Sequence, residues 1–226
     1  VGLFHKLERL GEEAARRWAE PDAGIWEFRA RAEVHTHSSV MCWAACDRLA
    51  RIADRLGLSE RCVHWRAIAD RIRAGVMERA WSEKRGSFVA TFDGADIDAS
   101  LLLMHDLGFI SAGDPRFVST VELISRELNQ GEFVFRYKRA DDFGVPRTSF
   151  TVCNFWLIEA LAAIGRIEEA RAKFERLLSH RSSLGLLSEG FDAATGEMWG
   201  NFPQTYSLVG LVRAAMRLSK PWENAF

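Results

Sequence analysis

Several features that would define a specialised class of protein are scarce in this sequence of 226 residues. Only four cysteines are present, and no two of them form a Cys-x-x-Cys pair, which argues against a disulfide scaffold and gives little support to a zinc or redox site. We interpret them as buried, reduced thiols of a cytoplasmic protein. They are Cys42, Cys46, Cys62 and Cys153.

A surplus of charge of one sign is also lacking. Thirty Lys and Arg residues stand against 31 Asp and Glu residues, which leaves a formal net charge of −1. No basic surplus therefore indicates binding to nucleic acid, and no charged tail indicates a membrane lipid or an acidic partner.

Long apolar runs are missing as well. The longest, residues 150–165, contains Asn154 and Glu159 and is shorter than the ~20 residues of a membrane-spanning helix. The first ten residues carry charged side chains and do not resemble a signal peptide. Because the sequence does not begin with Met, we expect a processed protein or a piece of a longer one.

The residues that are abundant suggest an ordinary globular chain with an unusual aromatic content. Hydrophobic residues make up 48% and charged residues 27%, and there are 8 Trp and 15 Phe but only 2 Tyr. Proteins rich in Trp bury their indoles or stack them on flat ligands, among which sugars are common.

Apolar residues recur with helical spacing along almost the whole chain. The pattern predicts helices at about residues 3–18, 38–56, 59–76, 96–107, 114–128, 151–164, 167–180 and 205–218. Two segments, Phe88–Phe92 and Phe133–Tyr137, alternate as short strands do but are too short to build a sheet. The sequence therefore predicts an all-α fold of antiparallel helix pairs.

Three connections are long, at residues 20–37, 130–149 and 182–204, and long ordered loops often carry functional sites. The first holds Glu27 between apolar residues, where desolvation would favour a protonated carboxyl group, and the third holds Glu189. Two carboxyl groups on converging loops suit hydrolysis of a glycosidic bond, in which one protonates the leaving oxygen and the other activates water. From spacing alone, a solvated or helix-capping role for both is the simpler alternative.

Several separated motifs occur in a characteristic order: Gly24-Ile25-Trp26-Glu27, Met41-Cys42-Trp43-Ala44, Phe92-Asp93-Gly94, Asp98-Ala99-Ser100, Arg136-Tyr137, Ser188-Glu189-Gly190-Phe191-Asp192 and Gly200-Asn201-Phe202-Pro203-Gln204. In this order they resemble glycoside hydrolase family 15, the glucoamylase-type family that also includes bacterial trehalases and dextran glucosidases. The resemblance implies an (α/α)6 toroid or barrel of helical hairpins that hydrolyses α-glucosides with inversion at the anomeric carbon.

The resemblance also implies a role for individual residues. Glu27 corresponds to the general acid, and Glu189 corresponds to the general base that deprotonates the attacking water. Trp26 would pack against the sugar, Arg136 would hydrogen-bond hydroxyls of the terminal glucose, and Tyr206 would supply an aromatic wall. The substrate would be an α-glucoside disaccharide or oligosaccharide, with no nucleic acid or membrane as partner.

Inverting hydrolysis sets further expectations. The two carboxyl groups should lie ~6.5–9.5 Å apart, and the rate should follow a bell-shaped pH profile. The chemistry requires no metal ion or organic cofactor, so we predict none. We interpret His35-x-His37 as structural rather than as a metal pair, and Asp93–Asp98 as a turn rather than a calcium loop.

Three single positions and one stretch of three residues depart from the family pattern. Gly190 stands where relatives usually have Glu or Gln, and Phe28 stands where fungal relatives have a second Glu. Leu208 replaces a His of many bacterial relatives, and Arg147-Thr148-Ser149 replaces a stretch that contains Gly. These differences bear on substrate and activity rather than on fold.

Length is the largest departure, because the sequence predicts about eight of the twelve helices of an (α/α)6 barrel and lacks the family's Trp-x-Arg-Asp motif. We therefore expect residues 1–226 to form a single domain that is the C-terminal two-thirds of a glycoside hydrolase catalytic domain, inactive when isolated. An open barrel exposes an apolar seam, which the missing N-terminal part of the same protein or a homo-oligomer would cover.

Two alternatives remain at this point. One is a non-catalytic helical-hairpin binding protein, against which the lack of a repeat of about 34 or 40 residues counts. The other is a sugar-binding pseudoenzyme with the same fold.

Overall fold

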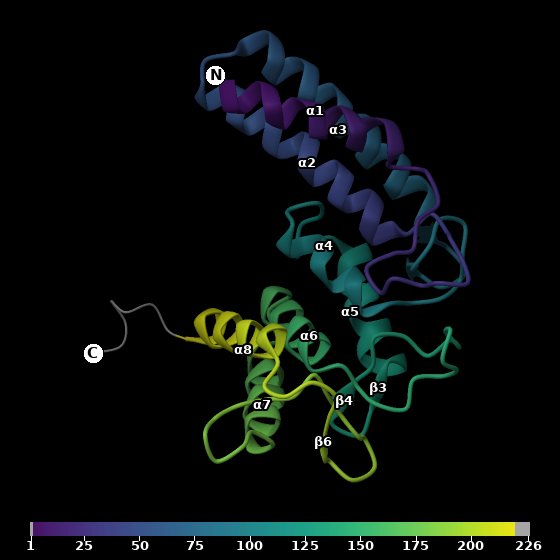
Figure 1. Cartoon of the computed structure of the whole chain (residues 1–226), viewed down its shortest axis with the longest axis vertical. Helices are drawn as coiled ribbons and strands as arrows, with labels where there is room; N and C mark the ends of the chain where they lie inside the picture. The colour runs from purple at the N-terminus through teal and green to yellow at the C-terminus, as the bar shows by residue number, and fades with distance from the viewer. Residues whose placement is uncertain (1, 220–226) are drawn as a thin grey trace. The chain divides into compact units, whose positions relative to one another are not determined.

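Helices make up most of the computed structural model, which describes residues 2–219 (Figure 1). They are α1 (Gly2–Arg17), α2 (Thr36–Arg55), α3 (Ser59–Arg79), α4 (Leu103–Asp106), α5 (Pro115–Glu127), α6 (Thr151–Ala163), α7 (Ile167–Ser179) and α8 (Thr205–Leu218). The short 3-10 helix η1 (Ala99–Leu102) leads directly into α4. Seven of the eight helices expected from the apolar spacing are present, whereas the one expected at 96–107 is a 3-10 helix followed by the single turn α4. The prediction of an all-α fold is confirmed.

Strands occur only as three antiparallel pairs of two residues each in the described part of the chain. They are β1 (Trp81–Ser82) with β2 (Ser87–Phe88), β3 (Asn129–Gln130) with β4 (Phe133–Val134), and β5 (Gly190–Phe191) with β6 (Met198–Trp199). The predicted segment Phe133–Tyr137 begins with β4, whereas Phe88–Phe92 shares only Phe88 with β2. The pair β5–β6, which lies beside Glu189, was not predicted.

The chain folds into two compact units, and each is described by itself. Unit 1 contains the residues up to 97 together with 104–111, and unit 2 contains 98–103 and the residues from 112 onward. The chain therefore passes from one unit to the other at η1, within α4 and before α5.

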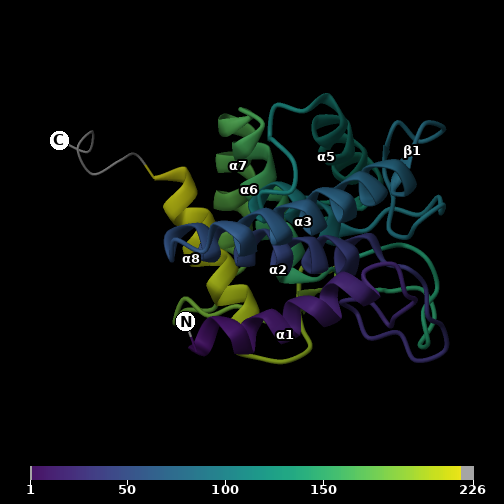
Figure 2. The same ribbon diagram turned by 90° about the horizontal axis from the view of Figure 1, so that it is seen from above.

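Unit 1 is built on the antiparallel hairpin of α2 and α3, along which α1 packs (Figures 1 and 2). Gly11 marks the close approach of α1 to α2, because a Cβ atom there would lie 2.2 Å from Leu49 Cδ1. The buried Glu8 of α1 accepts hydrogen bonds from Arg61 Nε at 2.6 Å and Trp65 Nε1 at 2.8 Å on α3.

Unit 2 is organised around α6, which is buried along almost its whole length and contacts α5, α7, α8 and η1. Helix α8 approaches α6 closely at Gly210, where a Cβ atom would lie 2.7 Å from Phe155 Cδ2. Asp114 caps α5 by accepting a hydrogen bond from Arg116 N–H at 2.9 Å, as the Asp-Pro pair predicts.

Within residues 2–219, no helix is both long enough and apolar enough to cross a membrane.

Candidate active site

The five residues expected at the site fall into two groups, one in each unit. Trp26 and Glu27 belong to the loop between α1 and α2 in unit 1, whereas Arg136, Glu189 and Tyr206 belong to unit 2. Trp26 is half-buried and Glu27 is exposed. Each unit thus positions its own part of the expected site.

A tight turn in unit 1 presents Glu27. Gly24 N–H donates to Asp22 Oδ1 at 2.7 Å, Glu27 N–H donates to Gly24 O at 3.1 Å, and Phe28 N–H donates to Ala23 O at 2.9 Å. Glu27 has φ +56°, in the left-handed region that residues other than Gly seldom adopt. Backbone strain of this kind persists only where the surroundings hold it, and it concentrates at functional sites.

Phe28 anchors this turn. Its ring is buried and stacks on His35, with ring centroids 5.8 Å apart and an interplanar angle of 21°. The Arg31 guanidinium lies 4.2 Å from the centroid of the Phe28 ring. The apolar surroundings expected for Glu27 therefore enclose Phe28 instead. Phe28, which departs from the pattern of the fungal relatives, thus has a structural role in this loop.

The His-x-His pair supports the same loop. Burial lowers the pKa of His37 to about 4, although the nearby charge of Asp22 acts in the opposite direction. His35 packs against Gly24, where a Cβ atom would lie 2.9 Å from the imidazole. No group of three or more His, Cys, Asp or Glu side chains in the described residues is placed to hold a metal ion.

Glu189 in unit 2 is held by its main chain and by one carboxylate oxygen. Its N–H donates to Asn201 O at 2.9 Å, and its carbonyl oxygen accepts a hydrogen bond from Thr151 N–H at 2.8 Å. Glu189 Oε2 accepts hydrogen bonds from Asn201 N–H at 3.0 Å and Asn201 Nδ2 at 2.9 Å. The other oxygen, Oε1, accepts no hydrogen bond from any residue between 2 and 219 and is available to a water molecule.

Gly190, the departure next to Glu189, has a steric cause. A Cβ atom at this position would lie 2.3 Å from Ser149 O. The backbones approach because Ser149 N–H donates to Phe191 O at 2.9 Å. A larger side chain here would require this backbone pairing to shift.

Arg136 is positioned by Asp141, a residue that the sequence analysis missed. Asp141 Oδ2 accepts a hydrogen bond from Tyr137 Oη at 2.7 Å and lies 3.4 Å from Arg136 Nη2. Burial and the hydrogen bond to Asp141 raise the pKa of Tyr137 to about 12. Burial acts to raise the pKa of Asp141, but hydrogen bonds from Tyr137 and Phe143 N–H and the nearby Arg136 outweigh it and lower that pKa.

The first turn of α6 connects Arg136 to Glu189. The Arg136 guanidinium lies 5.7 Å from the centroid of the Phe150 ring, and the next residue, Thr151, donates its N–H to Glu189 O. The Arg136 guanidinium and the Glu189 main chain therefore both contact the start of α6.

Tyr206 lies in the first turn of α8 and is 62% exposed. The next residue, Ser207, donates its hydroxyl hydrogen to Ser188 O at 2.7 Å and so ties the start of α8 to the neighbour of Glu189. Trp199 and Phe202 are exposed on the same segment. Unit 2 thus groups exposed aromatic side chains along the chain that follows Glu189.

Comparison with known proteins identifies the family. The model of "Glycosyl hydrolases family 15" matches residues 9–216. The chain belongs to glycosyl hydrolases family 15. The resemblance seen in the motifs is confirmed, and with it the all-α fold class of helical hairpins that this family's toroid implies.

Curated relatives in family 15 include two trehalases that are each 39% identical to the chain. One, from Mycobacterium tuberculosis, aligns over 226 residues, which are 99% of this chain and 33% of the relative. The other, from Thermoplasma acidophilum, aligns over 219 residues, which are 96% of this chain and 38% of the relative. The chain spans about a third of the length of the trehalases it matches.

Solved structures share the fold of this chain at low sequence identity. A glycosidase variant in complex with glucose has a TM-score of 0.74 at 16% identity, covering 90% of this chain and 57% of its own. A bacterial glucoamylase complexed with acarbose has a TM-score of 0.73 at 14% identity, covering 96% of this chain and 38% of its own.

Proposed function

We propose that this chain carries both catalytic carboxyl groups of a glycoside hydrolase that cleaves trehalose or a closely related α-glucoside with inversion. The arrangement of Glu189 carries the proposal, since one oxygen is fixed by Asn201 and the other is open to water. The names of the curated relatives support trehalose as the substrate.

In the proposed reaction, Glu27 donates its proton to the glycosidic oxygen as the bond from that oxygen to the anomeric carbon breaks. Glu189 Oε1 takes a proton from a water molecule, and the water oxygen bonds to the anomeric carbon from the opposite face. The glucose so formed has the β configuration. Glu27 must enter the cycle protonated and Glu189 ionised, which gives a bell-shaped pH profile.

Three further residues would bind the sugar. Arg136 is held by Asp141 and presents guanidinium donors that suit hydroxyl groups. Trp26 in unit 1 and Tyr206 in unit 2 each offer an aromatic surface that suits packing against a sugar ring.

We further propose that the chain is part of a larger (α/α)6 catalytic domain in a cytoplasmic enzyme. Apolar side chains that follow one another at helical spacing along α8 are exposed: Tyr206, Val209, Val212 and Met216. This surface suits cover by further helices of the same polypeptide or by a second copy. The cytoplasmic location rests on the four cysteines, all of which are free thiols, with Cys46 and Cys153 buried.

Isosteric substitutions test the two carboxyl groups. The variants Glu27→Gln and Glu189→Gln would be assayed for trehalose hydrolysis in a chimera that supplies the rest of the enzyme. In the chimera, the chain replaces the matching segment of the M. tuberculosis trehalase. We expect each substitution to lower kcat by ~10³-fold, because each removes one proton-transfer group. The thermal unfolding midpoint should change little.

Matched controls are Glu60→Gln in unit 1 and Glu122→Gln in unit 2, both at exposed helical positions. These should retain full activity. Variants of Glu27 and Glu189 that hydrolyse trehalose within tenfold of the parent would disprove the assignment. A folded chimera without activity would disprove the proposed function.

A further inference from the structure

A cleft of about 560 Å³ lies in unit 1 between the C-terminal part of α2 and the N-terminal part of α3. Arg48, Arg51 and Arg55 line it from α2, and Arg66 lines it from α3. Its lining also includes Ile52, Ala50 and Cys62. The cleft is therefore strongly basic, with a small apolar floor.

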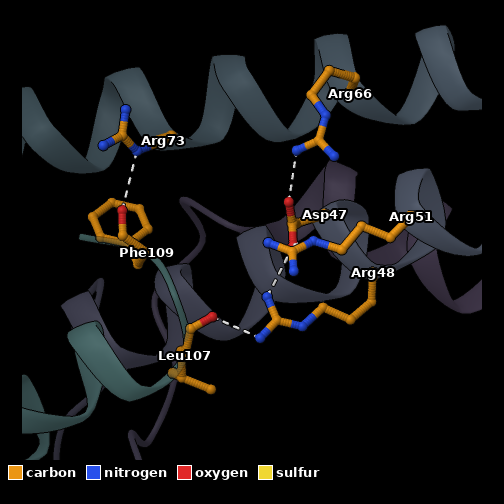
Figure 3. A network of polar contacts seen from close by, with 7 residues as sticks. All are labelled: Asp47, Arg48, Arg51, Arg66, Arg73, Leu107 and Phe109. Atoms are coloured by element: carbon orange, nitrogen blue, oxygen red, sulfur yellow. Dashed lines mark hydrogen bonds and ion pairs between the residues drawn. The ribbon is translucent and has the colours of Figure 1, made fainter. Parts of the chain in front are cut away.

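Three of these arginines converge on one buried carboxylate (Figure 3). Asp47, which is 1% exposed, lies 2.6 Å from Arg66 Nη1, 2.8 Å from Arg51 Nε and 3.0 Å from Arg48 Nη1. One negative charge thus holds three guanidinium groups together. The three positive charges repel one another, and Asp47 compensates only one of them, so a further anion would reduce the repulsion.

Only part of the hydrogen-bonding capacity of these arginines is used within unit 1. Arg48 makes a second bond, from Nη2 to Leu107 O at 2.6 Å. Among the described residues, Arg51 and Arg66 each pair only with Asp47, and their side chains are 62% and 43% exposed. The side chain of Arg55 makes no ion pair or hydrogen bond with another described residue. A guanidinium group has five N–H donors, so many remain for a ligand.

The charge of the cleft is not balanced by its own acids. Within residues 2–219, Asp54 is the only acidic residue that lines it, and Asp47 lies behind the arginines. The four arginines and two aspartates together carry a charge of +2, whereas the whole chain has a formal net charge of −1. The surplus of positive charge is therefore a local property of this cleft.

We propose that this cleft binds a multiply charged phosphate-type anion. Guanidinium groups recognise phosphate through pairs of parallel hydrogen bonds, which is the geometry that their unused donors permit. Arg48, Arg51 and Arg55 occur once per helical turn and extend over roughly 10 Å of α2. A row of that length exceeds one phosphate group and suits a ligand with two or more of them.

The cleft is separate from the loop that carries Glu27. That loop enters α2 at Thr36, and Ile52 in the cleft lies 16 residues further along the helix, roughly 24 Å at the rise of an α-helix. A bound anion would therefore cross-link α2 to α3 and stabilise unit 1 without taking part in bond cleavage. This inference does not depend on the proposed hydrolase function.

Tripolyphosphate is a suitable probe in buffer free of divalent metal ions and at ionic strength fixed with NaCl. We expect isothermal titration of the chain to show saturable binding of one anion, with orthophosphate and sulfate weaker. The thermal unfolding midpoint should rise with the same saturation. The double variant Arg51→Gln/Arg55→Gln should weaken tripolyphosphate binding at least tenfold, and it leaves Arg48 and Arg66 on Asp47.

The matched control is Arg71→Gln, which removes an exposed arginine of α3 outside the cleft and should leave the affinity unchanged. Three results would overturn the proposal. One is the absence of saturable binding, and another is equal weakening by the control, which would indicate unspecific charge attraction. The third is tighter binding of a hexaglutamate peptide than of tripolyphosphate, which would indicate an acidic protein partner.

Discussion

At the scale of single residues, the proposed role of Glu189 as general base depends on the orientation of its carboxylate. Asn201 fixes Oε2 from its main chain and its side chain, so Oε1 is the oxygen left for water. Gly200 makes this contact possible, because a Cβ atom there would lie 2.7 Å from Glu189 Oε2 and 3.1 Å from Glu189 Cβ.

Replacing Gly200 with Ala should therefore impair function more than stability. The residue has φ +78°, so any side chain adds backbone strain of about 1 kcal/mol. The new methyl group would also push the carboxylate away from Asn201, and displacement of a catalytic group by ~1 Å costs about 100-fold in rate. We expect this loss in kcat for trehalose hydrolysis.

Gly185→Ala is a matched control because Gly185 also has φ +78°, while a Cβ atom there would have no neighbouring atom within 4 Å. It should lose the same ~1 kcal/mol of unfolding free energy and retain activity. Equal kcat values for the two variants would show that the contact with the Glu189 carboxylate has no functional role.

The sequence singles out the proposed catalytic residues more readily than the residues that support them. Glu27 and Glu189 were recognised because they lie in motifs with a family resemblance. The motif that contains Asn201 does not reveal its hydrogen bonds to Glu189, and nothing in the sequence marks Asp141 as the partner of Arg136. Both contacts depend on how a loop folds back. The left-handed backbone of Glu27 and the backbone contact at Gly190 likewise require coordinates.

At the scale of elements, α1 is attached to α3 through a buried charge. Burial acts to raise the pKa of Glu8, but hydrogen bonds from Trp65, His5 and Arg61 outweigh it and lower that pKa to about 2. A carboxyl group whose pKa is lower in the folded state stabilises the fold fully above its unfolded pKa of 4.5. This contribution is lost as the pH falls from 4.5 towards 2.

Glu8→Gln should accordingly lower the unfolding free energy by about 2 kcal/mol near neutral pH, because Gln cannot pair with Arg61 as a charge. The difference between parent and variant should shrink as the pH approaches the folded pKa of about 2. Urea unfolding at several pH values measures it. Glu12→Gln, at an exposed position of α1, is the control and should show little effect. A difference for Glu8→Gln that does not vary with pH would contradict this account.

Element boundaries were predictable where local chemistry sets them. The sequence predicts the start of α5 from its Asp-Pro pair. It also predicts the end of α2 from Gly57, which has φ +70°. The β5–β6 pair was not predictable, because strands of two residues show no periodicity. The pair also depends on a backbone hydrogen bond from the distant Ser149 to Phe191.

At the scale of the whole molecule, the proposed acid and base belong to different units of one chain. Contacts internal to unit 1 position Glu27, and contacts internal to unit 2 position Glu189. Helical periodicity predicted the elements of both units. It did not predict the division, because that depends on long-range packing in which 98–103 joins the later helices and 104–111 joins the earlier ones.

The most direct test of the central claim is to follow trehalose hydrolysis by the trehalase chimera with proton NMR before mutarotation. Inversion at one anomeric carbon releases that glucose as the β anomer, and the departing glucose keeps its α configuration. We therefore expect α- and β-glucose in equal amounts at the earliest times. Release of α-glucose alone would contradict the claim, because that result means retention and a nucleophilic carboxylate in place of a base.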